Sequence, residues 1–108
     1  MLTRCYAITL NTRDWHATRH FYVNVLGLSV VAERPNVSFT LDIAGLPITF
    51  EAFYKKPDSF AELYFETEDV PHFCKRLRAA GHVVPHEWAD KAELRDPDGR
   101  RIIVTQRF

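Results

Sequence analysis

This 108-residue chain has five histidines and two cysteines, side chains that often bind transition metals or act in catalysis. Cys5 and Cys74 are far apart in sequence and form no C-x-x-C pair of the kind found in zinc and redox sites. His16 and His20 are four residues apart, so in a helix they would share a face that could bind a metal. Because no third ligand accompanies them, we expect exposed histidines, and we expect both cysteines to pack as small apolar residues.

The sequence contains no G-x-S-x-G nucleophile motif, no P-loop and no dinucleotide-binding glycine pattern, and we expect no cofactor. Aromatic residues make up 13% of the chain. Their flat faces bind planar molecules and stack on cations. We expect Trp88 to lie ahead of the last hairpin, where it could close over a ligand. Core packing is the expectation for four phenylalanines: Phe39, Phe50, Phe60 and Phe65.

The overall charge gives the chain little attraction for polyanions. Fourteen basic residues balance fourteen acidic ones, which disfavours nucleic acids and anionic membranes as partners. No apolar run approaches the roughly 20 residues of a membrane helix, and the first residues lack the apolar core of a signal peptide. We therefore expect a cytoplasmic protein whose length suits one domain.

The first half of the chain reads as one strand, one helix and three strands. Residues 5–10 alternate apolar and polar side chains, as a half-buried strand does. Asp14 is a predicted N-cap, and apolar residues then recur at helical spacing until Gly27 ends the helix. Turn residues separate three further predicted strands, at residues 28–33, 37–43 and 48–54.

The second half repeats this pattern after a polar linker at residues 55–59. Ile8, Leu10, Thr12 and Asp14 have counterparts 55 positions later, namely Leu63, Phe65, Thr67 and Asp69. A helix follows Asp69 and ends at Gly81, and strands are predicted at residues 82–85, 91–95 and 101–105, the last two joined by a tight turn at 96–99. The repeat predicts an α+β fold of tandem βαβββ modules, spanning residues 1–55 and 60–108. The alternative is an ordinary α+β domain whose two helices both begin with Thr-x-Asp.

Three segments resemble the vicinal oxygen chelate superfamily, which includes glyoxalase I, extradiol dioxygenases, fosfomycin-resistance thiol transferases and bleomycin-resistance proteins. Residues 14–28 are similar to the family's D-x(6)-F-Y-x(3)-L-G-L helix. Residues 63–70 resemble its second-half strand, and residues 95–100 resemble its R-D-P-D-G-N turn. The resemblance covers almost the whole chain and implies a curved eight-stranded mixed sheet with two outer helices.

The resemblance also indicates where a metal would bind. Enzymes of the family hold a divalent ion by one His, Gln or Glu on each of strands one, four, five and eight. The corresponding positions here are Ala7, Glu51, Glu62 and Ile103. Because two of the four lack a donor atom, and a transition metal usually needs three or more protein ligands, we expect neither a metal site nor a catalytic residue of that kind.

The resemblance instead favours a metal-independent binding protein of the bleomycin-resistance type. Such a protein would sequester a small aromatic or cationic ligand in the cavity of a homodimer, and would thereby confer antibiotic resistance. The expected ligand-binding residues are Glu51, Phe53, Glu62, Tyr64 and Trp88. The two glutamates could instead act together as an acid–base pair, contact Arg95 or Arg101, or simply line a wet cavity.

Two other functions stay open at this point. One is a metal-dependent lyase, isomerase or thiol transferase that uses Glu51 and Glu62 with a third ligand not recognised in the sequence. The other is a dimeric interaction module without a ligand, whose cavity would be filled by its own side chains.

Overall fold

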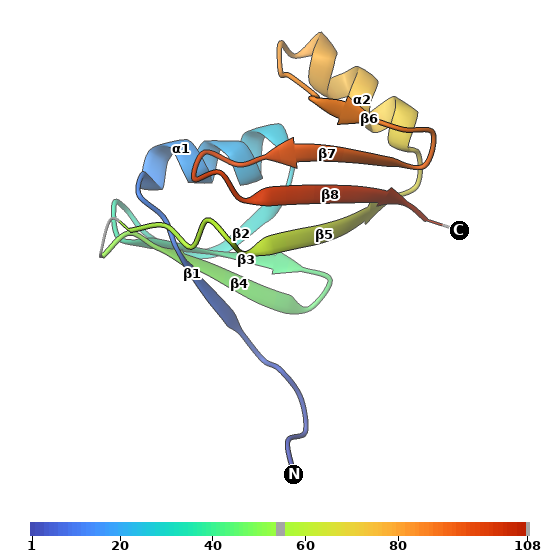
Figure 1. Cartoon of the computed structure of the whole chain (residues 1–108). Helices are drawn as coiled ribbons and strands as arrows, with labels where there is room; N and C mark the ends of the chain where they lie inside the picture. The colour runs from blue at the N-terminus through green and yellow to red at the C-terminus, as the bar shows by residue number, and fades with distance from the viewer. Residues whose placement is uncertain (54–55, 108) are drawn as a thin grey trace. The chain divides into compact units, whose positions relative to one another are not determined.

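The computed structural model describes residues 1–53 and 56–107, which form two compact units, Met1–Asp58 and Ser59–Phe108. Each unit contains a four-stranded mixed sheet and one helical segment (Figure 1). The eight strands of the described chain are thus divided equally between the two units, and the tandem βαβββ organisation is confirmed.

The first unit pairs its first strand with a strand distant in sequence. Its strands are β1 (Ile8–Asn11), β2 (Ser29–Arg34), β3 (Ser38–Ile43) and β4 (Leu46–Glu51). Their order in the sheet is β1-β4-β3-β2, with β1 parallel to β4 and the other pairs antiparallel. Along β4, Ile48 and Phe50 are buried whereas Thr49 and Glu51 are partly exposed, as the predicted alternation requires.

The helical segment of this unit covers the apolar face of its sheet. It starts as α1 (Trp15–Arg19) and continues as the π-helical η1 (His20–Val25), a change that hydrophobic spacing did not reveal. The Asp14 carboxylate accepts a hydrogen bond from the Ala17 backbone N–H at 3.1 Å, which confirms the predicted N-cap. Tyr22 is fully buried, and its ring lies 4.6 Å from that of Phe50.

The second unit repeats this arrangement. Its strands are β5 (Glu62–Thr67), β6 (His86–Glu87), β7 (Lys91–Arg95) and β8 (Arg101–Gln106), in the order β5-β8-β7-β6 with β5 parallel to β8. The helix α2 (Val70–Ala79) is capped by Asp69, which accepts a hydrogen bond from the His72 N–H at 2.9 Å. In the described part of the chain the longest helix has ten residues, and no helix meets the length and hydropathy that crossing a membrane demands.

Two predicted strands differ from the structure. Residues 82–85 are not a strand, because the His82 N–H bonds to the Leu77 carbonyl at the end of α2 and Pro85 has no N–H to donate. The strand there is the short β6, just after the proline. The first strand begins at Ile8 rather than Cys5, and the predicted end of the fourth strand at Tyr54 lies outside the described residues.

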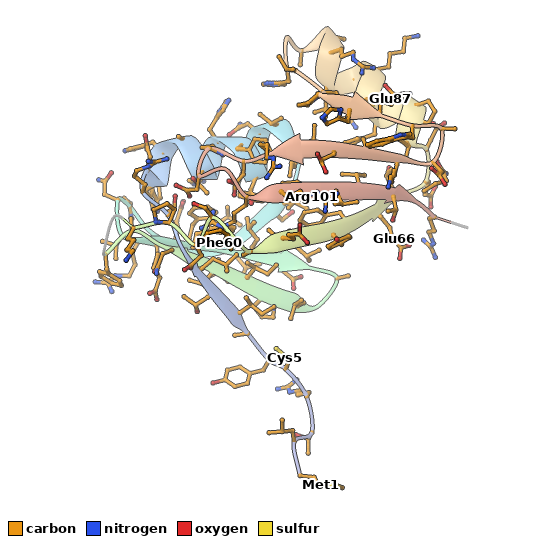
Figure 2. The ribbon with its side chains drawn as sticks, viewed as in Figure 1. Met1, Cys5, Phe60, Glu66, Glu87 and Arg101 are labelled. Atoms are coloured by element: carbon orange, nitrogen blue, oxygen red, sulfur yellow. The ribbon has the colours of Figure 1, made fainter. Side chains whose placement is uncertain are left out.

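Two predicted core residues are exposed. Phe60 is 99% exposed because it lies in the turn before β5 and not on the strand itself. Cys5 is exposed because it precedes the first paired residue of β1, whereas Cys74 is buried as predicted. Figure 2 shows Cys5 on the N-terminal segment that runs away from β1.

A buried ion cluster closes the turn between β7 and β8. The Arg100 side chain is fully buried, and its guanidinium donates to Asp96 at 2.9 Å and to Asp98 at 3.0 Å. The other oxygen of the Asp96 carboxylate accepts from the backbone N–H groups of Asp98 and Arg100, both at 2.9 Å. Aspartate oxygens therefore hold the backbone of the turn, as the sequence predicts.

The turn between β3 and β4 contains an unfavourable residue. Ala44 and Gly45 form a two-residue loop with φ of 51° and 89°. Positive φ at both positions is the mark of a type I′ turn, which favours Asn-Gly over Ala-Gly. Gly45 suits its position, whereas Ala44 is a residue with a side-chain Cβ in the left-handed region.

We predict that Asp96→Ala will lower the free energy of unfolding by about 3–5 kcal/mol, because it removes one of the two carboxylates that contact the buried guanidinium and the acceptor of two buried N–H groups. Urea denaturation followed by circular dichroism measures the change. Glu68→Ala serves as the control, since Glu68 is 88% exposed and its pair with Arg107 spans 3.8 Å. A loss for Asp96→Ala no larger than that for Glu68→Ala would contradict the structural role of the cluster.

We predict that Ala44→Asn will raise the free energy of unfolding by about 0.5–1 kcal/mol, because asparagine tolerates the left-handed conformation better than alanine. Gly45→Ala should instead lower the free energy of unfolding, by about 1 kcal/mol. An added Cβ at Gly45 meets no atom within 4 Å, so that loss comes from the backbone conformation. Thermal and urea unfolding of both variants measure whether Ala44→Asn stabilises the protein and Gly45→Ala destabilises it.

Candidate functional site

The face of the second sheet opposite α2, called here the second helix-free face, carries mainly charged and aromatic side chains. Leu63 and Phe65 alternate with its residues along β5 and point toward the α2 side. The strand register places the residues of the second helix-free face beside one another across the sheet. These residues are Glu62, Tyr64 and Glu66 on β5, Arg101, Ile103 and Thr105 on β8, Lys91, Glu93 and Arg95 on β7, and His86 on β6.

Arg101 is the centre of an ion cluster on this face. Its Nε donates to Glu93, and its terminal nitrogen donates to Glu62 at 3.1 Å. The Tyr64 hydroxyl donates to the other Glu62 oxygen at 3.3 Å. The pKa of Glu93 lies below its ordinary value of 4.5, chiefly because of the hydrogen bond from Arg101. Hydrogen bonds to Glu93 and Glu62 in turn raise the pKa of the Arg101 guanidinium.

Of the predicted site residues, Glu62 and Tyr64 are thus brought into contact. The contact of Glu62 with Arg101 was one of the alternatives open from the sequence, and it is present. Tyr64 remains 65% exposed, so its ring is available to a ligand. The second helix-free face therefore offers an aromatic surface beside a carboxylate whose charge is shared with an arginine.

Trp88 lies at the opposite edge of the same sheet. It follows β6, and its backbone N–H donates a hydrogen bond to the backbone carbonyl of Lys91 at 2.8 Å. The Lys91 ammonium lies 4.8 Å from the Trp88 ring centroid, and the His86 ring lies 5.9 Å from it. Since β5 and β6 are three strand spacings apart, about 14 Å separates Trp88 from the strand of Glu62 and Tyr64. Trp88 is 48% exposed and lies ahead of the last hairpin, as expected.

The remaining predicted residues, Glu51 and Phe53, belong to the first unit. Glu51 lies at the end of β4 on the face opposite α1, called here the first helix-free face, between Asn11 of β1 and Ser38 of β3. Within the described chain, no cation lies within ion-pair distance of the Glu51 carboxylate. Phe53 follows the end of β4 and is 59% exposed.

The residues at the family's metal positions do not fit a metal ion. Ala7 and Ile103 have no side-chain donor atom, and Glu62 is already held by Arg101 and Tyr64. No group of three or more His, Cys, Asp or Glu residues in the described chain could hold an ion. A zinc or transition-metal site needs at least three protein ligands, so we derive no catalytic step through a metal.

The side chains first considered for chemistry are separate from these faces. His16 on α1 and His20 on η1 are exposed, as expected. Burial, followed by the negative charge of Glu87, raises the pKa of the Cys74 thiol. A buried thiol with a raised pKa is a poor nucleophile, which agrees with a packing role for Cys74.

Sequence reasoning missed Glu93 as a member of the site. The signal was present, because a tight turn at residues 96–99 implies that β7 and β8 pair in an antiparallel register around it. That register places Arg95 opposite Arg101 and Glu93 opposite Ile103. Counting outward from the turn would therefore have brought Glu93 and Arg101 to the same face.

We predict that Arg101→Met will raise the pKa of Glu93 toward its ordinary value, because the variant removes the hydrogen bond that lowers it. A depressed pKa in the folded state contributes stability above the unfolded pKa, and this stability is lost as the pH falls through the folded value. The variant should therefore lose less stability than the parent on acidification below about pH 4.5. Carboxyl-carbon NMR titration measures the shift; Arg107→Met, which removes the cation beside Glu68, should leave Glu93 unchanged.

The chain is similar in fold to several solved structures. An antibiotic-binding protein, TnmS3 from Streptomyces sp. CB03234, is 24% identical, with a TM-score of 0.79 over 99% of this chain and 98% of that one. Lactoylglutathione lyase from Agrobacterium tumefaciens is 18% identical, with a TM-score of 0.78 over 98% and 95% of the two chains. A bleomycin-binding protein complexed with bleomycin is 22% identical, with a TM-score of 0.66 over 99% and 100%.

Sequence comparison gives the family directly. A search of curated proteins finds no matching relative. The family model named Glyoxalase/Bleomycin resistance protein/Dioxygenase superfamily matches residues 6–104, which include both helical segments and all eight strands of the described chain except the last residues of β8. The chain therefore belongs to the Glyoxalase/Bleomycin resistance protein/Dioxygenase superfamily.

Proposed function

We propose that this protein binds and sequesters a small aromatic or cationic molecule in the cytoplasm, without a metal, in the manner of bleomycin-resistance proteins. The proposed contact residues are Glu51, Phe53, Glu62, Tyr64 and Trp88. The observation that carries the proposal is the composition of the helix-free faces, where exposed aromatic rings and carboxylates are present and two of the four family metal positions lack a donor atom.

Aromatic side chains supply the proposed affinity for a planar ligand. Phe53, Tyr64 and Trp88 each keep about half or more of their surface exposed, and removing such surface from water is favourable by about 25 cal/mol per Å² of apolar area. The Lys91 ammonium already lies 4.8 Å from the centroid of the Trp88 ring, so a cationic group would have to displace Lys91 or stack on the opposite ring face. A flat ligand whose charged group lies away from Lys91 would satisfy both features.

The two glutamates contribute unequally to this proposal. Glu62 shares its charge with Arg101, so a cationic ligand would have to compete with an ion pair that is already formed. Glu51 has no such competitor in the described chain. We therefore assign the stronger electrostatic attraction for an amine to Glu51.

The names of similar proteins include both binding and catalytic roles. Two solved structures of the same fold are an antibiotic-binding protein and a bleomycin-binding protein. Others of the same fold are named as lyases or glyoxalases, so the fold does not select between the two functions. The donor atoms support the binding role, because Ala7 and Ile103 cannot contribute a ligand to a metal site.

We also propose that two copies of the chain form a homodimer with two equivalent ligand sites. Phe60 and Val83 are 99% and 78% exposed, and large exposed apolar side chains commonly mark association surfaces. A dimer would cover such residues and would help to enclose the ligand. Sedimentation equilibrium tests this part of the proposal independently of ligand binding.

The function is tested by native mass spectrometry of the purified chain against a library of planar, cationic and antibiotic molecules, followed by thermal-shift titration of each hit. We predict a saturable rise in melting temperature with a hit, at least a tenfold weaker affinity in Trp88→Ala, and a smaller loss in Glu62→Ala, since Glu62 is already paired with Arg101. Tyr6→Ala serves as the control, because Tyr6 is an exposed aromatic residue ahead of β1. Melting of each variant without ligand reports on folding.

The same preparations distinguish the alternative functions. Metal analysis of protein purified without chelator, together with titrations of Mn, Ni, Zn, Fe and Co, should give no stoichiometric metal and no saturable shift. A stoichiometric metal with turnover of a thioester or thiol substrate would support the metal-dependent lyase, isomerase or transferase instead. Absence of any ligand together with a stable dimer would support an interaction module.

A further inference from the structure

We propose, on the basis of the function proposed above, that the first helix-free face recognises a hydroxylated amine such as an amino sugar, with Glu51 binding its ammonium group. This face lies on β1, β3 and β4, and its chemistry differs from that of the second helix-free face. The polar residues near Glu51 are Thr9, Asn11, Ser38, Thr40 and Thr49, whereas Asp42 lies outside this group, at the far end of β3.

Short hydrogen-bonding side chains surround the Glu51 carboxylate. In its own row across the sheet, Asn11 lies opposite on β1 and Ser38 lies opposite on β3. In the next row, Thr9, Thr49 and Thr40 are direct neighbours on the same three strands. Adjacent strands are about 4.8 Å apart, so hydroxyl or amide groups stand on three sides of the carboxylate.

The charge of Glu51 is the part of this surface that selects an amine. The carboxylate is partly buried, and Arg34, the arginine in the same row, lies two strands away, about 10 Å. Asp42, at the other end of β3, accepts a hydrogen bond from the Gly45 N–H in the adjacent turn. An ammonium group could therefore bind the Glu51 carboxylate without displacing another cation, because no cation in the described chain forms an ion pair with it.

The hydroxyl groups select a ligand that carries its own hydrogen-bonding groups. The hydroxyls of Thr40 and Thr49 lie 2.8 Å apart and already hold each other in place. Threonine is stiff at χ1, so little freedom is lost when a ligand binds it. A purely apolar ligand would remove these groups from water without replacing their hydrogen bonds, which is unfavourable, whereas a sugar ring offers a donor and an acceptor at each hydroxyl.

The test is an NMR titration of the full-length, ¹⁵N-labelled protein with three probes. Glucosamine has both hydroxyls and an amine, glucose lacks the amine, and cyclohexylamine lacks the hydroxyls. The expected result is that glucosamine binds at least fivefold more tightly than either of the other two, and that it shifts backbone resonances of residues 9–11, 38–41 and 48–51. Loss of this preference, or shifts confined to the second unit, would overturn the proposal.

Two charge-matched variants separate Glu51 from the general acidity of the face. Glu51→Gln should weaken glucosamine binding at least fivefold, to the level of glucose. Asp42→Asn removes the same charge from the same face about 13 Å further along β3, and should leave the affinity unchanged. Equal losses in both variants would count against a specific anchor. Ser38→Ala, expected to weaken binding of both sugars but not of cyclohexylamine, provides a second test if Glu51→Gln perturbs the spectrum of the free protein.

Failure here is distinguishable from failure of the proposed function. If a planar cation from the library binds through Trp88 while glucosamine produces no shifts, the amino-sugar assignment is wrong and sequestration stands. If Trp88→Ala and Glu62→Ala leave every hit unaffected while glucosamine still binds through Glu51, the aromatic site is wrong and the recognition by the first unit stands.

Discussion

The turn that joins β7 and β8 is the constraint on which the second helix-free face depends. Arg100 is fully buried there, and its guanidinium is paired with the carboxylates of Asp96 and Asp98. Burying an arginine is tolerable because both aspartates accept from it and because Asp96 also holds backbone N–H groups. The turn sets which residues of β7 face which residues of β8. A slip of one residue would move Glu93 away from Arg101 and onto the α2 side.

The two modules use one backbone plan for different surface chemistry. In each, an aspartate caps the helical segment, and the two central strands of the sheet have a buried side beneath it. This half of each sheet serves stability and accounts for the recognisable repeat. The opposite half is under no packing constraint from the helix. In the first module it carries short hydroxyls around Glu51, whereas in the second it carries long charged side chains and aromatic rings. The family's shared fold depends on the sheet faces that pack beneath the helices, whereas the choice of ligand depends on the opposite faces.

Local signals accounted for most of the fold. Asp14 and Asp69 were recognisable as caps because their oxygens act within three residues of their own position. Strand alternation likewise identified the buried sides of β4 and β5. The errors arose where a residue's environment depends on a neighbour or on where pairing begins. Residues 82–85 have apolar content suited to a strand, but the end of α2 and Pro85 prevent pairing there. Phe60 and Cys5 have apolar side chains, but each lies just ahead of the first paired residue of its strand.

The sequence by itself determined the repeat, the helix caps, the faces of most strands and the lack of donor atoms at Ala7 and Ile103, since all of these follow from residue type and short-range spacing. Only the tertiary structure decided how the two glutamates differ. Glu62 is paired because the parallel pairing of β5 with β8 brings it to Arg101, 39 residues further along the chain. Glu51 instead lies between Asn11 and Ser38, which are contributed by two other strands. Cross-strand neighbours come from segments distant in sequence, and an electrostatic environment is set by such neighbours within a few ångströms.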